Sequence, residues 1–331
     1  MRAVVVDEPG GPEVLQVVDV PAPSPDEGEL SIDVDFAGVG FVDTLFRAGA
    51  FGLAWPFIPG IEVTGRVREL GAGVEGFRVG QPIAALLNDF GRGSRAGGYA
   101  EVAVARTGMV TTVPEGADLA RAAAVLVNGV TGWIALHHLA RLQTSDDVVV
   151  LGASGGLGGT ASRLAAIHPA RRVIGVAGSD TKRRFIPAEC TDVICGSQLS
   201  TALTKITDGR GVDVVIDPVG GQLRAEAYER LAPFGRLIVL VNASGQDQAL
   251  SSDAAWHGTR HLAGLSLGGI AHLVPAQISA AASTVVGLVH RGVLHEPAPT
   301  LLPLNRVSET HRALQDRCAP PKTVLAIHDN T

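Results

Sequence analysis

Cysteine is scarce in this chain, and so are aromatic residues. The 331 residues include Cys190, Cys195 and Cys318, with no C-x-x-C pair. Free thiols in a reducing compartment are therefore expected rather than a disulfide framework. Aromatic residues make up 4% of the chain, against 41 glycines, which favours tight turns and close backbone contacts over large aromatic anchors.

Long apolar runs and basic runs are also missing. No stretch of about eighteen uncharged apolar residues occurs, so no membrane span is expected. The apolar run at residues 3–6 is too short for a signal peptide and predicts a first strand. A net charge of −6 argues against nucleic acid as a partner. The composition, 46% hydrophobic and 18% charged, is that of a globular protein. The expected free thiols favour the cytoplasm as its location.

The most informative segment runs from residue 148 to 167. Four apolar residues lead into the cluster Ala153-x-Gly155-x-x-Gly158, and small and aliphatic residues follow at helical spacing. This strand, turn and helix pattern places a pyrophosphate on a helix N-terminus, which predicts a dinucleotide site. The alternative is a glycine-rich connection in another α/β domain.

Two rhythms divide the chain. Up to about residue 120, short strands separated by Gly and Pro predict a barrel-like domain. These strands are expected at 3–6, 15–20, 30–37, 63–70, 82–87 and 100–105. From about residue 123, strands alternate with room for crossover helices, which predicts a doubly wound parallel sheet. Its strands are expected at 148–151, 172–177, 193–195, 212–217, 236–241 and 262–267.

The last sixty residues predict a return to the first domain. A helix is expected at 275–290, and strands at 300–303 and 323–327 frame a helix at 307–316. Asp118 is expected to cap the helix that follows it. The cofactor domain would then be an insertion between two pieces of the other domain.

Six motifs carry a family resemblance over nearly the whole chain. They are AGVGFVDT at 37–44, PGIEVTGRV at 59–67, GAGVEGFRVGQ at 71–81, GGYAE at 97–101, VVIDPVGG at 214–221 and GRLIVLV at 235–241. With the glycine turn, they resemble the medium-chain dehydrogenase/reductase superfamily, and within it the zinc-free, zeta-crystallin-like quinone oxidoreductases. The resemblance implies an α/β protein with a GroES-like β-barrel substrate domain (1–122 and 268–331) and a Rossmann domain (123–267). It also implies a homodimer formed through the edge strand near 262–269.

The resemblance also bears on zinc. Members that hold catalytic zinc use Cys, His and Cys, and the matching positions here are Gly40, Ile61 and Asn128. Glycine and isoleucine have no donor atom and a neutral amide is a poor zinc ligand, so no metal is expected. Residues 88–98 also lack the cysteines of a structural zinc lobe. Glu62, beside a lost ligand, is interpreted as structural, or else as ordering water.

Without metal, reduction of a conjugated acceptor is the easier reaction. Hydride can add to a quinone or an α,β-unsaturated carbonyl because conjugation spreads the charge onto oxygen. The protein then needs to orient the reactants and supply hydrogen-bond donors. The expected function is NADPH-dependent, zinc-independent reduction of such a small molecule. Two alternatives stay open: a specialised enoyl reductase acting on a polyketide or thioester intermediate, and a non-catalytic member that binds NADPH.

The cofactor choice rests on the end of the second strand of the parallel sheet. No carboxylate stands at its tip, where NAD-binding folds place one for the ribose hydroxyls. Gly178, Ser179 and Lys182 suit a 2′-phosphate instead, and the resemblance gives the lysine that role. NADPH is therefore favoured. Asp180 keeps NADH possible, and the alternative for Lys182 is an ordinary solvated residue at the start of a helix.

The remaining site residues follow from the resemblance. Cofactor contacts are expected from Thr131, Ala153, Ser154, Gly155, Gly156, Leu157, Gly158, Gly178, Ser179, Lys182, Val219, Val241, Asn242, Ala243, Ser244, Arg317 and Lys322. For Arg317 and Lys322 the alternative is a surface cation. The substrate pocket is expected to include Gly40, Phe41, Leu45, Trp55, Leu87 and Leu267, each of which could instead be core.

The substrate side departs from the family. Gly40 replaces an Asn that is usual there, and Leu45 replaces a Tyr. Their loss predicts a roomier, more apolar pocket. Asp43, Asn128 and Asn242 are the catalytic candidates, and Asn88 is a further polar group, but none is a convincing essential acid.

Overall fold

The computed structural model describes residues 1–87, 97–320 and 322–328. The chain divides into two compact units: Met1–Val130 with Leu267–Thr331, and Thr131–Ser266. The sequence-predicted boundary at 122/123 falls inside helix α2 (Leu119–Ile134), which is continuous through it. Asp118 caps that helix as expected, since its Oδ1 accepts a hydrogen bond from the Arg121 amide at 3.0 Å.

The first unit is built on a seven-stranded sheet in the order β14-β15-β3-β4-β5-β7, with β6 paired to β3. The strands are β3 (Glu29–Val39), β4 (Glu62–Leu70), β5 (Pro82–Leu86), β6 (Val102–Arg106), β7 (Val110–Thr112), β14 (Thr300–Pro303) and β15 (Thr323–Ala326). β15 pairs antiparallel with β3. The prediction that the C-terminal strands return to the first part of the chain is therefore confirmed.

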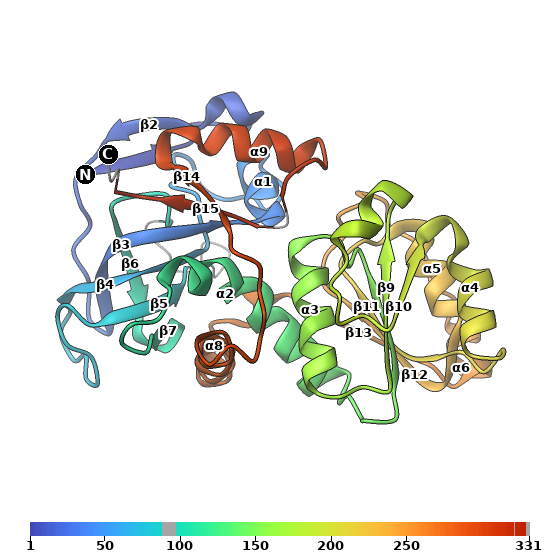
Figure 1. The fold of residues 1–331 in the computed structure, drawn as a ribbon. Coiled ribbons are helices and arrows are strands. Elements are labelled where there is room, and N and C mark those ends of the chain that lie inside the picture. Colours follow the sequence, from blue (N-terminus) through green and yellow to red (C-terminus); the bar gives the residue numbers. More distant parts are fainter. Residues whose placement is uncertain (88–96, 321, 329–331) are drawn as a thin grey trace. The chain divides into compact units, whose positions relative to one another are not determined.

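Short elements complete this unit. β1 (Arg2–Val5) and β2 (Gln16–Asp19) form a separate antiparallel pair. Helix α1 (Phe41–Arg47) contacts α9 (Val307–Gln315), which lies beside it in Figure 1. Helix α8 (Pro275–His290) packs near β7. Buried side chains from these strands, mostly valine, leucine, isoleucine and alanine, form one apolar core.

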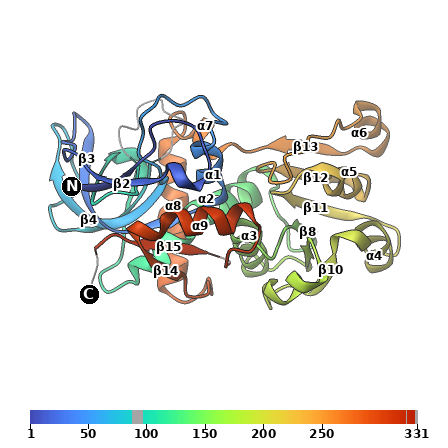
Figure 2. The same ribbon diagram turned by 90° about the horizontal axis from the view of Figure 1, so that it is seen from above.

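The second unit is a six-stranded, fully parallel sheet in the order β10-β9-β8-β11-β12-β13. Its strands are β8 (Asp147–Leu151), β9 (Arg172–Ala177), β10 (Asp192–Cys195), β11 (Val212–Asp217), β12 (Leu231–Val239) and β13 (His261–Gly264). Figure 2 shows β10 and β13 at the outer edges. The predicted parallel sheet is confirmed. In doubly wound folds of this strand order, dinucleotides bind at the carboxyl ends of the strands.

Helices cover both faces of this sheet. In Figure 1, α3 (Gly156–Ile167) lies on one face, and α4 (Leu199–Ile206), α5 (Gly221–Glu229) and α6 (Ser252–Gly258) lie on the other. The strands are therefore apolar on both sides, and β8 is buried at every position. The crossover between β9 and β10 holds only a 3₁₀ segment, Asp180–Phe185, where a helix start was one interpretation.

Two strand predictions were wrong in their limits. β12 begins at Leu231 rather than 236, and Pro233 and Gly235, which are typical of a turn, lie inside it. The strand tolerates them through a register shift opposite Val212–Val214 of β11. β13 ends at Gly264, so Leu267 does not close it. Leu267 instead begins α7 (Leu267–Ile270), in the first unit.

One helical segment, Leu119–Leu139, is long and apolar enough to cross a membrane, judged on length and composition within the described residues. Of its most apolar window, 72% is buried inside the structure. A core helix of a soluble protein meets the same criteria.

Candidate functional site

The glycine turn joins β8 to α3. Gly152 adopts a φ of 62°, which favours glycine, and the Gly155 amide donates to the Gly152 carbonyl at 2.9 Å. A Cβ on Gly158 would collide with that same carbonyl oxygen. No side chain caps the start of α3, where Gly155 is the N-cap residue. The first amides of the twelve-residue helix thus remain open to an anion.

The predicted cofactor residues of this turn differ in their exposure to solvent. Gly155 is exposed, and Ser154, Gly156 and Leu157 are half-buried. The Ala153 side chain is fully buried, and its amide donates to the Val176 carbonyl at 3.0 Å. Ala153 therefore shapes the turn rather than presenting a side chain. Thr131, 7% exposed, lies in α2.

The end of β9 leaves one lysine uncommitted. Asp180 lies 3.6 Å from Arg183, and the Ser179 and Thr181 hydroxyls lie 3.0 Å apart. In the part of the chain that the structure describes, Lys182 makes no ion pair. A Cβ on Gly178 would meet nothing within 4 Å. This corner thus combines open space, hydroxyl groups and a free ammonium group, whereas its carboxylate already faces an arginine.

A buried ion pair organises the ends of β11 and β12. Asp217, fully buried, accepts hydrogen bonds from the amides of Val219 and Gly220, each at 2.8 Å. Its other oxygen pairs with Arg224 Nε, and Arg224 Nη2 donates to the Val241 carbonyl at 3.1 Å. Asp217 and Arg224 therefore tie together the two loops that carry the predicted cofactor residues. Sequence reasoning missed both residues.

The loop after β12 is fixed by further contacts. The Ser244 hydroxyl donates to Asn242 Oδ1 at 2.8 Å, and the Ser244 amide donates to the Val219 carbonyl at 2.8 Å. Gly220, with a φ of 79°, has no room for a Cβ because Asn242 Oδ1 lies against it. The amide oxygen of Asn242 is thus occupied, which leaves its NH₂ group as the donor. Ala243, between Asn242 and Ser244 in the sequence, is half-buried.

In the first unit, Asp43 is enclosed by the protein. It is fully buried in the first turn of α1, where its Oδ2 accepts from the Gly40 amide at 2.7 Å. Burial is the main cause that raises its pKa from 3.8 to about 7; Glu62 raises it further, and the Gly40 amide opposes the shift. The structure therefore gives Asp43 an internal position, without direct access for a substrate.

The predicted pocket residues divide into core and partly exposed groups. Leu87 belongs to the core of the first unit, and Trp55 packs against it. Gly40, Phe41, Leu45, Asn128 and Leu267 are half-buried. Asn88 lies outside the described residues.

Lys322 is committed to another partner. Its Nζ pairs with Glu62 Oε1, and Glu62 Oε2 accepts from the Val127 amide at 2.6 Å. Glu62 is 1% exposed, and Gly38 leaves room for it because a Cβ there would overlap the carboxylate. Glu62 thus links β4, α2 and the C-terminal segment. Arg317, exposed, lies just beyond α9 with a φ of 55°.

The donors present do not suit zinc. Gly40 and Ile61 offer no side-chain ligand atom, and Asn128 offers a neutral amide. No group of three His, Cys, Asp or Glu side chains able to hold a metal occurs among the described residues. His137 and His168 approach at 5.0 Å between ring centroids, and burial lowers the pKa of His137 to about 4, but no third ligand joins them.

Comparison with known proteins defines the class. Residues 26–115 match the alcohol dehydrogenase GroES-like domain, and residues 156–285 match the zinc-binding dehydrogenase domain. The quinone oxidoreductase of Rattus norvegicus is 32% identical over 246 residues, covering 72% of this chain and 73% of the relative. Quinone oxidoreductase-like protein 2 of the same species is 29% identical, covering 98% and 92%.

Solved structures agree over the whole length. A mycobacterial protein complexed with NADPH matches with a TM-score of 0.89 and 27% identity, covering 99% of this chain and all of that one. The predicted fold, a GroES-like domain and a Rossmann domain, is confirmed. The chain belongs to the medium-chain dehydrogenase/reductase superfamily and, within it, to the quinone oxidoreductase family.

Proposed function

We propose that this protein is an NADPH-dependent, zinc-independent reductase of quinones and α,β-unsaturated carbonyl compounds in the cytoplasm. The observation that carries the proposal is Lys182, which makes no ion pair with a described residue and follows β9. The neighbouring strand β8 leads into the uncapped start of α3. Quinone oxidoreductase relatives and an NADPH-complexed structural neighbour support it.

The second unit supplies a matched set of cofactor groups. The amides at the start of α3 suit the pyrophosphate, because a helix N-terminus favours negative charge. Lys182, with Ser179 beside it, suits a 2′-phosphate. Asp217 and Arg224 hold the loops of Val219 and Val241 in place for the nicotinamide end.

NADPH, when bound, supplies the hydride. The residues of this chain hold the two reactants in register and exclude water. The Asn242 NH₂ group is the candidate donor toward the oxygen on which negative charge develops. Solvent then supplies the proton. A conjugated acceptor needs no Lewis acid for this step, which agrees with the lack of zinc donors at Gly40 and Ile61.

A panel of acceptors tests the proposal. Purified protein is mixed with NADPH and with a quinone, an enone or an enoyl thioester, and absorbance at the NADPH band is followed. Oxidation with quinones or enones is expected. Turnover confined to enoyl thioesters would contradict the proposed substrate class and favour a specialised enoyl reductase. Tight NADPH binding without any turnover would refute the enzymatic role.

A homodimer is part of the proposal. β13 is an edge strand in the described sheet, and Leu262 on it is 54% exposed. An edge strand without charged residues exposes backbone N–H and C=O groups that can pair with a strand of another chain. Light scattering should therefore report a dimer, and Leu262→Lys should shift it toward monomer. A wild-type protein that is monomeric at all concentrations would contradict this assignment.

A further inference from the structure

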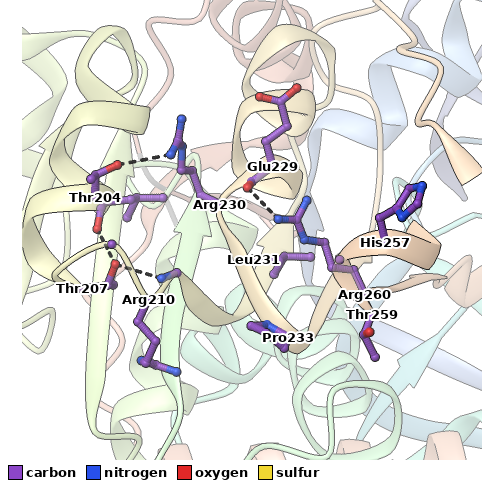
Figure 3. Close-up of a pocket in the computed structure, with 14 residues that line it drawn as sticks. Thr204, Thr207, Arg210, Glu229, Arg230, Leu231, Pro233, His257, Thr259 and Arg260 are labelled. Carbon is purple, nitrogen blue, oxygen red and sulfur yellow. Dashed lines mark hydrogen bonds between the residues drawn. The ribbon is translucent and has the colours of Figure 1, made fainter. Parts of the chain in front are cut away.

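The amino edge of the parallel sheet carries a cavity of about 380 Å³. Its walls come from the end of α4, the turn into β11, the end of α5 and the connection from α6 to β13 (Figure 3). β11 and β12 begin at this edge, whereas the glycine turn follows the carboxyl end of β8. Because all six strands are parallel, the cavity lies at the sheet edge opposite the dinucleotide turn. Its size is in the range of small-molecule sites.

Three arginines line the cavity, but only one is neutralised. Arg210 pairs with Asp213 at 2.7 Å and with Asp147 at 3.0 Å, and Figure 3 shows its side chain directed away from Arg230 and Arg260. Across the described ranges, neither Arg230 nor Arg260 pairs with a carboxylate. Arg230 and Arg260 therefore line the cavity without an ion pair to a carboxylate of the described chain.

Their existing contacts are weak or neutral. Arg230 Nη1 donates to Thr204 Oγ1 at 3.4 Å. Arg260 Nη2 donates to the Glu229 backbone carbonyl at 3.1 Å, and its guanidinium lies 5.9 Å from the centroid of the Tyr228 ring. The Nε atoms of both arginines are buried and have no hydrogen-bond partner. A buried donor without an acceptor is unfavourable, so both guanidinium groups have unused hydrogen-bonding capacity.

The chemistry of the missing acceptor follows from the guanidinium group. Arginine presents Nε–H and Nη–H as a planar fork that matches two oxygens of a carboxylate or a phosphoryl group. Of the fourteen lining residues, Glu229 is the one acid, while His257 and three threonines add polar groups. The charge balance of the lining is thus positive.

We propose that this cavity binds a small oxyanion, with a phosphoryl or carboxylate group held by Arg230 and Arg260. The site is separate from the cofactor turn and does not depend on the enzymatic proposal above.

Calorimetry with two probes tests the site. Inorganic phosphate or succinate is titrated, at constant ionic strength, into protein saturated with NADPH, so that the glycine turn is not available. Saturable binding of one anion per chain is expected, and the tighter probe identifies the ligand as phosphoryl or carboxylate. Arg230→Gln and Arg260→Gln should each weaken binding about tenfold or more.

Two further variants keep the test decisive. Lys205→Gln removes an equal charge from an exposed position on α4 that does not line the cavity, and it should leave binding unchanged. Glu229→Gln should tighten binding by about threefold, a gain that misfolding would not produce. Absence of saturable binding for both probes, or binding that survives both arginine substitutions, would overturn the proposal.

Discussion

Two fully buried aspartates, one in each unit, have opposite surroundings. Asp217 has a cation, Arg224, and two backbone amides as partners. Asp43 has one backbone amide and the Tyr99 hydroxyl beside it, and it forms no ion pair within the described residues. A buried charge is tolerated when it is paired and expensive when it is not. The comparison teaches that burial alone does not mark a functional acid, because the partners decide whether the group stays charged.

The largest expected effect comes from breaking the paired aspartate. Arg224→Met leaves the Asp217 carboxylate buried without its cation, which should cost about 3–5 kcal/mol of stability. The loops of Val219 and Val241 also lose their link, so NADPH binding should weaken. Urea unfolding and calorimetric titration of NADPH measure the two effects.

The double variant Asp217→Asn with Arg224→Met is the control for this prediction. It removes both charges, so it should be more stable than Arg224→Met alone. If the double variant lost as much unfolding free energy, relative to wild type, as the two single variants together, Asp217 and Arg224 would not be energetically coupled.

The unpaired aspartate should make stability depend on pH. The pKa of Asp43 is about 7 in the fold against an ordinary 3.8, so between these values the folded protein holds a proton that the unfolded chain has lost. Stability should therefore fall as pH rises from about 4 to about 7, by up to about 4 kcal/mol, and level off above.

Asp43→Asn should remove this slope, because an amide keeps the acceptor for Gly40 and does not titrate. The measurement is the urea midpoint from pH 5 to 8, taken as the difference between variant and wild type. His311, whose pKa burial lowers to about 3, contributes the opposite slope to both proteins and cancels. The exposed Asp19→Asn is the matched control, and an equal slope in Asp43→Asn would contradict the assignment.

The same contrast between paired and unpaired groups applies to two lysines, where the expected effect on binding is smaller. Lys182 is uncommitted, unlike Lys322, which pairs with Glu62. Lys182→Ala should raise the KM for NADPH about tenfold, since one charge-assisted contact is lost, and leave the KM for NADH unchanged. Steady-state kinetics with one quinone measure both. The exposed neighbour variant Arg184→Ala should change neither, and an equal effect there would indicate general electrostatics.

Much of the fold could be predicted because apolar runs and glycine punctuation coincide with the elements. The strands expected at 172–177 and 212–217 have those bounds in the structure. β12 was placed too late because Pro233 and Gly235 are typical of turns. Only the register shift against β11 shows how they fit into a strand.

The ion pair of Asp217 and Arg224 could not be predicted in the same way. The two residues are joined through a turn in which Gly220 has a φ of 79°. The spacing of residues in the sequence does not predict this backbone conformation. The commitment of Lys322 to Glu62 is similar, because those residues are distant in sequence and meet only through the sheet. The cofactor turn itself was readable because all its parts are contiguous.

The most direct test of the central claim is a calorimetric titration of NADPH and of NADH into the wild-type protein. The account predicts one NADPH site per chain and a dissociation constant for NADPH at least about tenfold lower than for NADH. Equal affinities for the two, or no binding of either, would contradict it.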